Sequence, residues 1–164
     1  IHCNSTGRKP SSANGFEIYL LRPGKTDNAI NIAAKENQAI EFEENKSRYE
    51  ELTEEFFILL TMRQSAFAKY SEEFAVVASD MMSQEFNVQN SGVKQAGFYV
   101  LVGASMPNVL VETGYLSNRT EEKILRSQDG QKRMAEALFK GIKSYKLIYE
   151  KDLKEGRPAD PEGN

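Results

Sequence analysis

The sequence of 164 residues predicts one α/β domain in which helices cover both faces of a mixed, mostly parallel sheet. Two observations support this fold class. Short, β-rich apolar runs alternate along the chain with longer segments whose apolar residues recur at helical spacing, and this alternation is typical of layered α/β domains. The length also suffices for a single hydrophobic core. In such folds the functional residues gather where strands end in loops.

The N-terminal residues predict the end of one strand, a loop and a second strand. Ile1-His2-Cys3-Asn4 reads as a strand end, because residues 5–14 that follow are rich in Gly, Pro, Ser and Asn. In Gly15–Leu21 apolar and polar residues alternate with the period of two that is typical of strands, and Arg22-Pro23-Gly24 ends this pattern. The sequence starts with neither an initiator methionine nor a charged-then-apolar leader, so we expect residues to precede Ile1.

Two helices are predicted next. Thr26 or Asp27 can cap the first helix, and its apolar stripe contains one acid, Glu36. The stripe consists of Ala29, Ile32, Ala33, Glu36 and Ile40. Between Glu54 and Phe86, aromatic and aliphatic residues recur at steps of three, four or seven, which predicts a long amphipathic helix that packs on the sheet.

Two apolar runs in the second half of the chain predict central strands. Asn87–Gly97 is polar and contains two glycines, so we expect a connection there. Phe98–Val102 and Val109–Val111 are short β-rich runs of the kind that is buried on both faces of a sheet. Glu112 follows the second run directly, so a carboxylate stands at the exit of a predicted central strand.

The C-terminal part predicts helix followed by a tail. Asn118 can cap a helix, and Glu121 can return a hydrogen bond to the cap residue. The final helix has an apolar face that consists of Met134, Leu138, Ile142, Tyr145 and Tyr149. We expect the domain to span residues 1–150 and residues 151–164, whose end is rich in Gly, Pro and acids, to form a disordered tail.

Composition excludes several classes of function. The formal net charge of -3 and the pI near 5.4 come from acidic and basic residues mixed along the chain, which leaves no basic face for nucleic acid. The best apolar stretch, Phe56–Leu60, is far shorter than the ~20 residues of a membrane span, so none is expected. Cys3 is the single cysteine, which excludes an internal disulfide. The sequence lacks a glycine-rich phosphate loop, which argues against a nucleotide-binding domain.

His2 and Glu112 are the candidate functional residues. Each alone has a structural explanation, since a lone histidine is commonly a surface or core residue and a strand-end acid is commonly a helix cap. Together they supply an imidazole that can bind zinc and a carboxylate that can take a proton from water, as metal-assisted amide hydrolysis requires. A catalytic zinc takes three protein ligands, and His2 is the one obvious ligand in this sequence.

Four segments carry a resemblance to a known family. Ile1–Asn4 resembles the pattern S-I-H-x-N, and Gly15–Tyr19 resembles the strand that follows it. Gly92–Leu101 resembles the strand pattern G-V-K-x-A-x-(F/L)-x-V-L. Met106–Asn118 resembles M-P-x-V-L-V-E-x-G-[FY]-[IL]-S-N over its whole length, which is highly specific. These are patterns of the zinc-dependent type-3 N-acetylmuramoyl-L-alanine amidases, and the resemblance continues to about residue 148.

The resemblance implies a peptidoglycan hydrolase that acts in cell-wall remodelling or daughter-cell separation. It implies that His2 is a zinc ligand and that Glu112 is the catalytic base for cleavage of the amide between N-acetylmuramic acid and L-alanine. The family's other ligands, a histidine in an H-G-G-x-D segment and a glutamate, would precede Ile1. Residues 1–150 would then be part of a catalytic domain, exported to the periplasm or the cell wall.

The resemblance also implies a regulatory helical insert over residues 26–86. Division-associated members of the family begin such an insert where Ala33–Asn37 stands here, and their inhibitory glutamate maps to Glu36. An ionised carboxylate on an apolar face needs a cation or water. Glu36 therefore either blocks the zinc site until a protein activator moves the insert, or simply reaches solvent. A catalytically inactive cell-wall-binding or regulatory module of the same fold is the alternative function, and the presence of both His2 and Glu112 argues against it.

Overall fold

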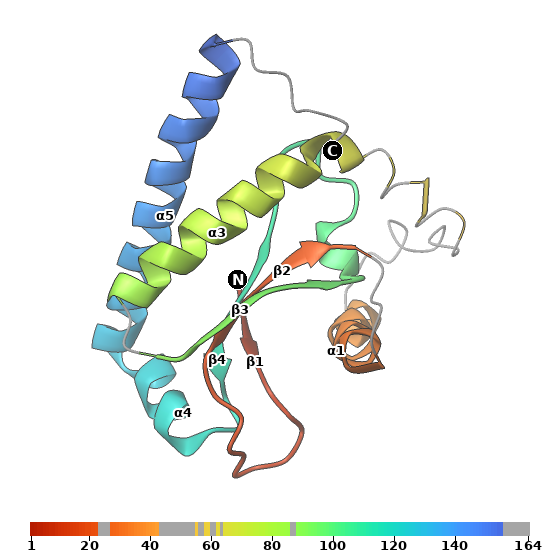
Figure 1. The fold of residues 1–164 in the computed structure, drawn as a ribbon. Helices are drawn as coiled ribbons and strands as arrows, with labels where there is room; N and C mark the ends of the chain where they lie inside the picture. Colours follow the sequence, from red (N-terminus) through yellow and green to blue (C-terminus); the bar gives the residue numbers. More distant parts are fainter. Residues whose placement is uncertain are drawn as a thin grey trace.

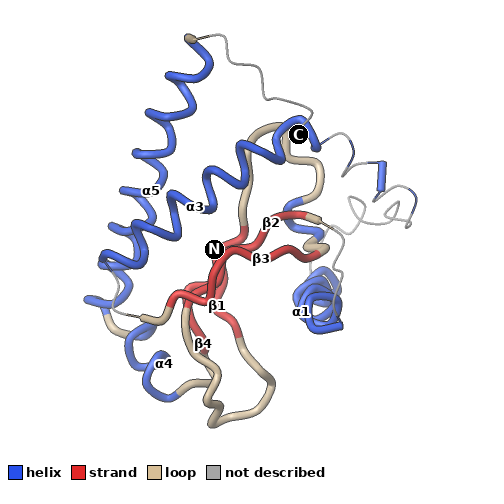
Figure 2. Tube along the Cα trace, in the orientation of Figure 1, coloured by secondary structure: helices blue, strands red, loops and turns tan. Residues whose placement is uncertain are grey.

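A four-stranded sheet forms the centre of the molecule (Figures 1 and 2). The computed structural model describes residues 1–22, 27–42, 55, 58–59, 62, 64–85 and 88–155. The strand order is β1-β4-β2-β3, and the strands are β1 (His2–Asn4), β2 (Phe16–Leu21), β3 (Asn90–Ala96) and β4 (Leu110–Tyr115). β1 is parallel to β4 and β2 is parallel to β3, whereas β2 and β4 are antiparallel. The predicted mixed, mostly parallel sheet is therefore confirmed.

Helices cover both faces of this sheet, as predicted (Figure 1). On one face α3 (Ala68–Glu85) and α5 (Gln128–Lys154) pack on β2 and β4. Their core consists of Phe16, Ile18, Leu20, Ala75, Ala78, Met82, Val111, Met134, Ala137 and Leu138. On the other face α1 (Asp27–Asn37) inserts Ala33 into a second, smaller core. That core also contains Tyr19, Ala96, Phe98, Leu101 and Leu110.

Small residues allow α3 and α5 to pack closely. A Cβ atom added at Gly141 of α5 would lie 3.2 Å from the Cα atom of Ala78 in α3, so the two backbones nearly touch there. Farther along the same interface, the rings of Phe74 and Tyr145 stack with their centroids 4.8 Å apart. The two helices thus form one layer on this face of the sheet.

The position of one predicted strand is wrong. Residues Asn90–Ala96, expected to be a polar connection, form β3, whereas the apolar run Phe98–Val102 contains the 3-10 turn η3 (Tyr99–Leu101). The physical reason is that Phe98 and Leu101 are buried between α1 and the sheet, so their apolar character reflects burial in a core and not strand pairing. β3 pairs only with β2 at the end of the sheet order, where polar side chains reach water.

The predicted helices are present, with different limits. α1 ends at Asn37 and continues as the 3-10 helix η1 (Gln38–Phe42), so Ile40 lies beyond the α-helix. α3 begins at Ala68 after the 3-10 turn η2 (Ser65–Phe67), and much of the earlier part of the predicted Glu54–Phe86 helix lies outside the described residues. Thr26, one of the two candidate caps, also lies outside them.

The C-terminal helix differs from its prediction in two respects. Met134, Leu138 and Tyr145 are buried as expected, but Ile142 is 53% exposed. α5 also continues to Lys154, four residues past the expected end of the domain. The remainder of the expected tail, residues 156–164, lies outside the described residues.

The turn between β4 and α4 (Arg119–Arg126) is organised by two polar side chains. Asn118 caps the helix as predicted, because its side chain accepts hydrogen bonds from the backbone N–H groups at positions 120 and 121. Glu121 does not return a bond to this cap. Its buried carboxylate instead accepts the N–H of Gly15 at 2.6 Å and the N–H of Tyr115 at 2.7 Å. Glu121 thereby joins the start of β2 to the end of β4.

The described helices include none with the length and apolar character that crossing a membrane requires.

Gly15 is required for the close approach of β2 to the end of the α3–β3 connection, which gives a first testable prediction. Its φ is +99°, and a Cβ atom there would lie 2.5 Å from the carbonyl oxygen of Gln89. Gly7 has a similar φ of +72° with no atom near its would-be Cβ. We expect Gly7→Ala to cost about 1–2 kcal/mol of unfolding free energy through backbone strain alone. Gly15→Ala should cost a further ~1–3 kcal/mol because of the steric clash.

Chemical denaturation of the two variants of the full-length protein measures this difference. Equal losses of unfolding free energy in the two variants would contradict the close approach at Gly15.

Candidate metal and catalytic site

The three residues singled out by the sequence meet at one point of the structure. His2 comes from β1, Glu112 from β4 and Glu36 from α1. The His2 Nδ1 atom lies 3.1 Å from the Glu36 carboxylate and 3.8 Å from the Glu112 carboxylate. One ligand atom from each residue falls within 4.8 Å of the other two, which is close enough for a single metal ion to contact all three.

Pairing of β1 with β4 sets the position of His2. The Cα atoms of His2 and Glu112 are register partners in this parallel pair. The Thr113 hydroxyl donates to the His2 carbonyl oxygen at 2.9 Å, and the Cys3 sulfur lies 3.2 Å from the same hydroxyl. Strand pairing between residues far apart in the sequence thus brings the imidazole beside the carboxylate.

The last turn of α1 is anchored on both sides of Glu36. The Lys35 ammonium donates to the carbonyl oxygen of Ser5, just after β1. On the other side, the Asn37 amide donates to the Gly97 carbonyl oxygen at 3.0 Å and accepts the N–H of Tyr99 at 2.9 Å. These bonds hold the helix over the sheet so that Glu36, only 23% exposed at its side chain, reaches His2.

Glu112 is a buried acid without ordinary hydrogen-bond partners. It is 1% exposed, and neither of its carboxylate oxygens has a hydrogen-bond partner within the described part of the chain. Burial, followed by the nearby charges of Glu36 and Glu17, raises the pKa of the Glu112 carboxyl to about 7. A buried carboxylate costs free energy unless a cation or a donor compensates it. The His2, Glu36 and Glu112 side chains therefore fit a divalent cation of the kind that imidazole and carboxylate bind, such as zinc.

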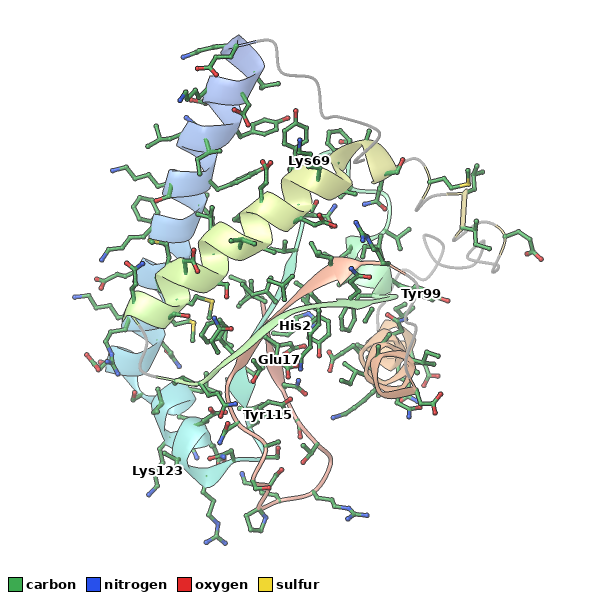
Figure 3. All side chains as sticks on the ribbon, viewed as in Figure 1. His2, Glu17, Lys69, Tyr99, Tyr115 and Lys123 are labelled. Atoms are coloured by element: carbon green, nitrogen blue, oxygen red, sulfur yellow. The ribbon has the colours of Figure 1, made fainter. Side chains whose placement is uncertain are left out.

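Glu17 is a buried site residue that the sequence analysis missed. It is 3% exposed, and its Cα atom is the register partner of Glu112 across the β2–β4 pair. Four side chains from all four strands donate to its carboxylate, and these donors are Asn4, Tyr19, Lys94 and Tyr115. Figure 3 labels His2, Glu17 and Tyr115, which lie close together on the sheet. Burial and the Glu17 carboxylate together raise the pKa of both tyrosines above their ordinary value, so both remain donors.

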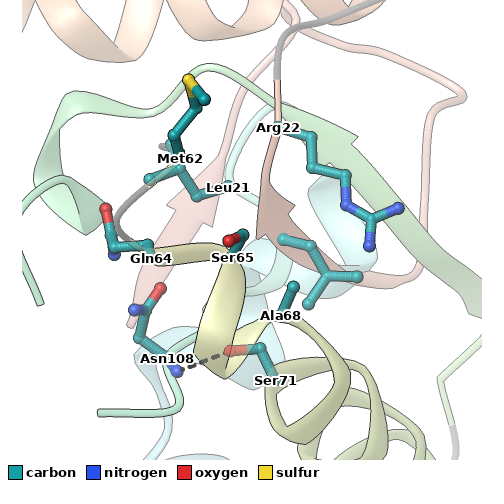
Figure 4. Close-up of a pocket in the computed structure, with 9 residues that line it drawn as sticks. Leu21, Arg22, Met62, Gln64, Ser65, Ala68, Ser71 and Asn108 are labelled. Carbon is teal, nitrogen blue, oxygen red and sulfur yellow. Dashed lines mark hydrogen bonds between the residues drawn. The ribbon is translucent and has the colours of Figure 1, made fainter. Parts of the chain in front are cut away.

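A pocket elsewhere on the surface is separate from these residues (Figure 4). It is lined by Leu20, Leu21, Arg22, Met62, Gln64, Ser65, Ala68, Ser71 and Asn108. Two of its polar side chains have partners, since Arg22 pairs with Glu72 and the Ser71 hydroxyl accepts the N–H of Asn108 at 3.0 Å. This pocket lacks the combination of imidazole and carboxylate that the site around Glu112 provides.

Comparisons with known proteins identify relatives of the chain. Residues 1–144 match the family described as N-acetylmuramoyl-L-alanine amidase. The chain is 30% identical over 150 residues to the N-acetylmuramoyl-L-alanine amidase AmiC of Escherichia coli O6:H1, and the match covers 88% of this chain and 34% of that protein. The chain therefore spans about one third of the length of this relative.

Solved structures of amidases have a fold similar to that of this chain. The amidase AmiC2 of Nostoc punctiforme is similar with a TM-score of 0.56 and 27% identity, over 90% of this chain and 56% of that chain. The CwlD amidase of Clostridioides difficile, solved in complex with the GerS lipoprotein, shares the fold with a TM-score of 0.57 and 20% identity, over 90% and 53% of the two chains.

The contrast between two buried acids gives the second prediction. Glu112 has oxygens without a hydrogen-bond partner among the described residues, whereas Glu121, which is also buried, accepts two backbone N–H groups. In metal-free protein at mildly alkaline pH, Glu112→Gln should raise the unfolding free energy by ~1–3 kcal/mol, because it replaces a buried, uncompensated charge with a neutral amide. Glu121→Gln should lower it by ~1–3 kcal/mol, because the amide N–H2 then faces a backbone donor.

Thermal unfolding in the presence of a chelator compares the two variants. A loss of stability in Glu112→Gln as large as that in Glu121→Gln would show that Glu112 is already compensated in the metal-free protein.

Proposed function

This chain belongs to the N-acetylmuramoyl-L-alanine amidase family, and from that membership we propose that its protein hydrolyses peptidoglycan at the amide between N-acetylmuramic acid and the L-alanine of the stem peptide. The observation that carries the proposal is the Glu112 carboxylate, which is buried beside His2 and accepts no hydrogen bond from any described residue. Such a reaction serves cell-wall remodelling or daughter-cell separation, and its substrate lies outside the cytoplasmic membrane. The protein would therefore be exported to the periplasm or the cell wall.

Zinc is the proposed cofactor, and His2 is its proposed ligand in this chain. A bound zinc ion would supply positive charge that activates water and polarises the amide carbonyl group. The His2 imidazole fits this role because it is partly exposed, ends beside two carboxylates and has its backbone fixed by Thr113. Since the chain covers only part of its relatives, the experiments below use the full-length protein.

Glu112 is the proposed general base. It lies beside His2 and has no hydrogen-bond partner among the described residues, so it is free to accept a proton from the attacking water and to pass it to the leaving amine. Its burial excludes bulk water from the carboxylate, which strengthens its electrostatic effect on the reacting groups.

A matched pair of variants tests these two roles. Glu112→Gln should keep zinc content near that of the parent and lower peptidoglycan hydrolysis by about 100-fold or more, because an amide cannot accept the proton. His2→Ala should lower the zinc content itself, because it removes one protein ligand. Metal analysis and release of soluble fragments from purified peptidoglycan measure the two effects. Substantial turnover in Glu112→Gln would remove the base role, and full zinc occupancy in His2→Ala would remove the ligand role.

Glu36 is the proposed inhibitory residue. Its carboxylate occupies the space beside His2 and Glu112, where water and the substrate carbonyl group would have to enter. The anchors at Lys35 and Asn37 hold it in this position. Residues 26–86 would then form a regulatory insert, and a protein activator that binds this insert would open the site by favouring a state without the Glu36 contact.

The basal activity of a Glu36 variant tests the inhibitory role. Glu36→Ala should raise peptidoglycan hydrolysis several-fold without any activator, because it removes the contact that closes the site. Glu41→Ala is the matched control, since Glu41 is an exposed acid on the adjoining η1 helix. Rates are compared at equal zinc content. A Glu36→Ala variant no faster than the parent, or a Glu41→Ala variant equally accelerated, would contradict the inhibitory role.

A further inference from the structure

Glu17 connects all four strands of the sheet from a buried position. Its Oε1 atom accepts from the Lys94 ammonium at 2.5 Å and from the Tyr115 hydroxyl at 3.1 Å. Its Oε2 atom accepts from the Tyr19 hydroxyl at 2.6 Å and from the Asn4 amide at 3.3 Å. One carboxylate thus holds side chains of β1, β2, β3 and β4 together.

This arrangement carries an electrostatic cost. Glu17 lies opposite Glu112 in the antiparallel register, and like charges on directly opposed residues destabilise a sheet. A well-packed apolar network is commonly at least as stabilising as a buried ionic one. Sheet stability alone therefore does not explain a carboxylate at this position. The groups that Glu17 binds indicate what else it does.

The bond to Asn4 is the one that reaches the candidate site. β1 is three residues long, and its register with β4 shifts between His2 and Asn4, so the ladder alone leaves its position weakly determined. The Thr113 hydroxyl holds β1 to the adjacent strand β4. The Asn4–Glu17 bond extends past β4 and ties the end of β1 to β2.

We propose that Glu17 is a positioning residue that, through Asn4, holds β1 so that the His2 imidazole stays beside Glu112 in a geometry ready to bind zinc. The zinc in this proposal rests on the proposed function, but the position of the His2 imidazole can be measured in metal-free protein. Asn4 can link Glu17 to β1 because its side-chain oxygen accepts the N–H of Ser5 at 2.7 Å, which fixes the orientation of its amide group. Rotation of the amide would break that bond, so its N–H2 group is committed to Glu17.

Glu17→Gln is the informative substitution. The glutamine keeps the shape of the side chain but carries one N–H2 group, so it cannot accept from all four donors. The Lys94 ammonium and the Asn4 N–H2 group can only donate, and they approach different oxygens of Glu17. The retained oxygen therefore faces Lys94, and Asn4 loses its acceptor.

Lys94→Met provides the matched control. It also removes one hydrogen bond from Glu17, but on the side of β3, and leaves the Asn4 bond in place. In the full-length protein, competition with a chelator should show zinc bound about 10–100-fold more weakly by Glu17→Gln. The zinc affinity of Lys94→Met should stay within about threefold of that of the parent, even if its thermal stability falls as much as that of Glu17→Gln. Asn4→Ala should weaken zinc binding as Glu17→Gln does, and the double variant should be no weaker than the weaker single variant.

NMR of the isotope-labelled His2 ring supplies a readout without metal, assigned by its loss in His2→Ala. The ring signals should broaden or split in Glu17→Gln and remain single in Lys94→Met. Unchanged zinc affinity and ring signals in Glu17→Gln would overturn the proposal. The proposal would also be overturned if Glu17→Gln and Lys94→Met both lost zinc affinity in proportion to their loss of thermal stability. A parent protein that binds no zinc would contradict the proposed function instead, and the ring signals would still decide the role of Glu17.

Discussion

The antiparallel pairing of β2 with β4 places two buried carboxylates, Glu17 and Glu112, opposite each other, and the site depends on how this repulsion is compensated. Glu17 is surrounded by donors from four strands, whereas Glu112 has no hydrogen-bond partner among the described residues. One carboxylate is therefore committed to the sheet, and the other is the one to which the proposed base role falls.

The two faces of the sheet differ in composition, since one is apolar and the other carries the buried carboxylates. The face under α3 and α5 is an apolar core to which β2 contributes alternate residues and β4 contributes Val111. On the opposite face the apolar part is small and lies under α1, and the polar part contains Glu17, Glu112 and His2. Since α1 packs on the apolar part through Ala33, its last turn reaches the polar part. The contact of Glu36 with His2 is thus a direct result of helix packing.

The sequence predicted the parts of the fold that depend on local pattern. Strand β2 was predicted from its alternation. The apolar run before Glu112 correctly predicted a strand, but Glu112 lies inside β4 and not at its exit, because the pairing continues to Tyr115. The apolar pattern missed β3, because an edge strand with polar side chains has no such pattern, although the family resemblance indicated a strand from Gly92 onward. Phe98–Val102 was expected to be a strand because residues buried in a core and residues of a central strand are both apolar. The meeting of His2 with Glu112 could be expected only from the family resemblance, since strand order is not a local property.

Glu17 was missed, and Glu121 was assigned the wrong partner, for a different reason. An acid at an alternate position of a strand is ordinarily expected to face solvent, and an acid three residues after a helix cap is ordinarily expected to complete it. Their real partners are Asn4, Lys94 and Gly15, among others, and these come from distant parts of the chain. A buried acid whose donors come from distant residues has no signature within a short window of sequence.

The parallel pairing of β1 with β4 also determines when the site can exist during folding. Cys3 and Thr113, whose side chains meet beside His2, are 110 residues apart in the chain. Closing so long a loop costs conformational entropy before any contact is gained, so pairs of this separation form after local helices and hairpins. A partly folded chain with α3 and α5 in place would therefore still lack the His2–Glu112 pair. Formation of the His2–Glu112 contact would report completion of the native topology, which helix content does not reveal.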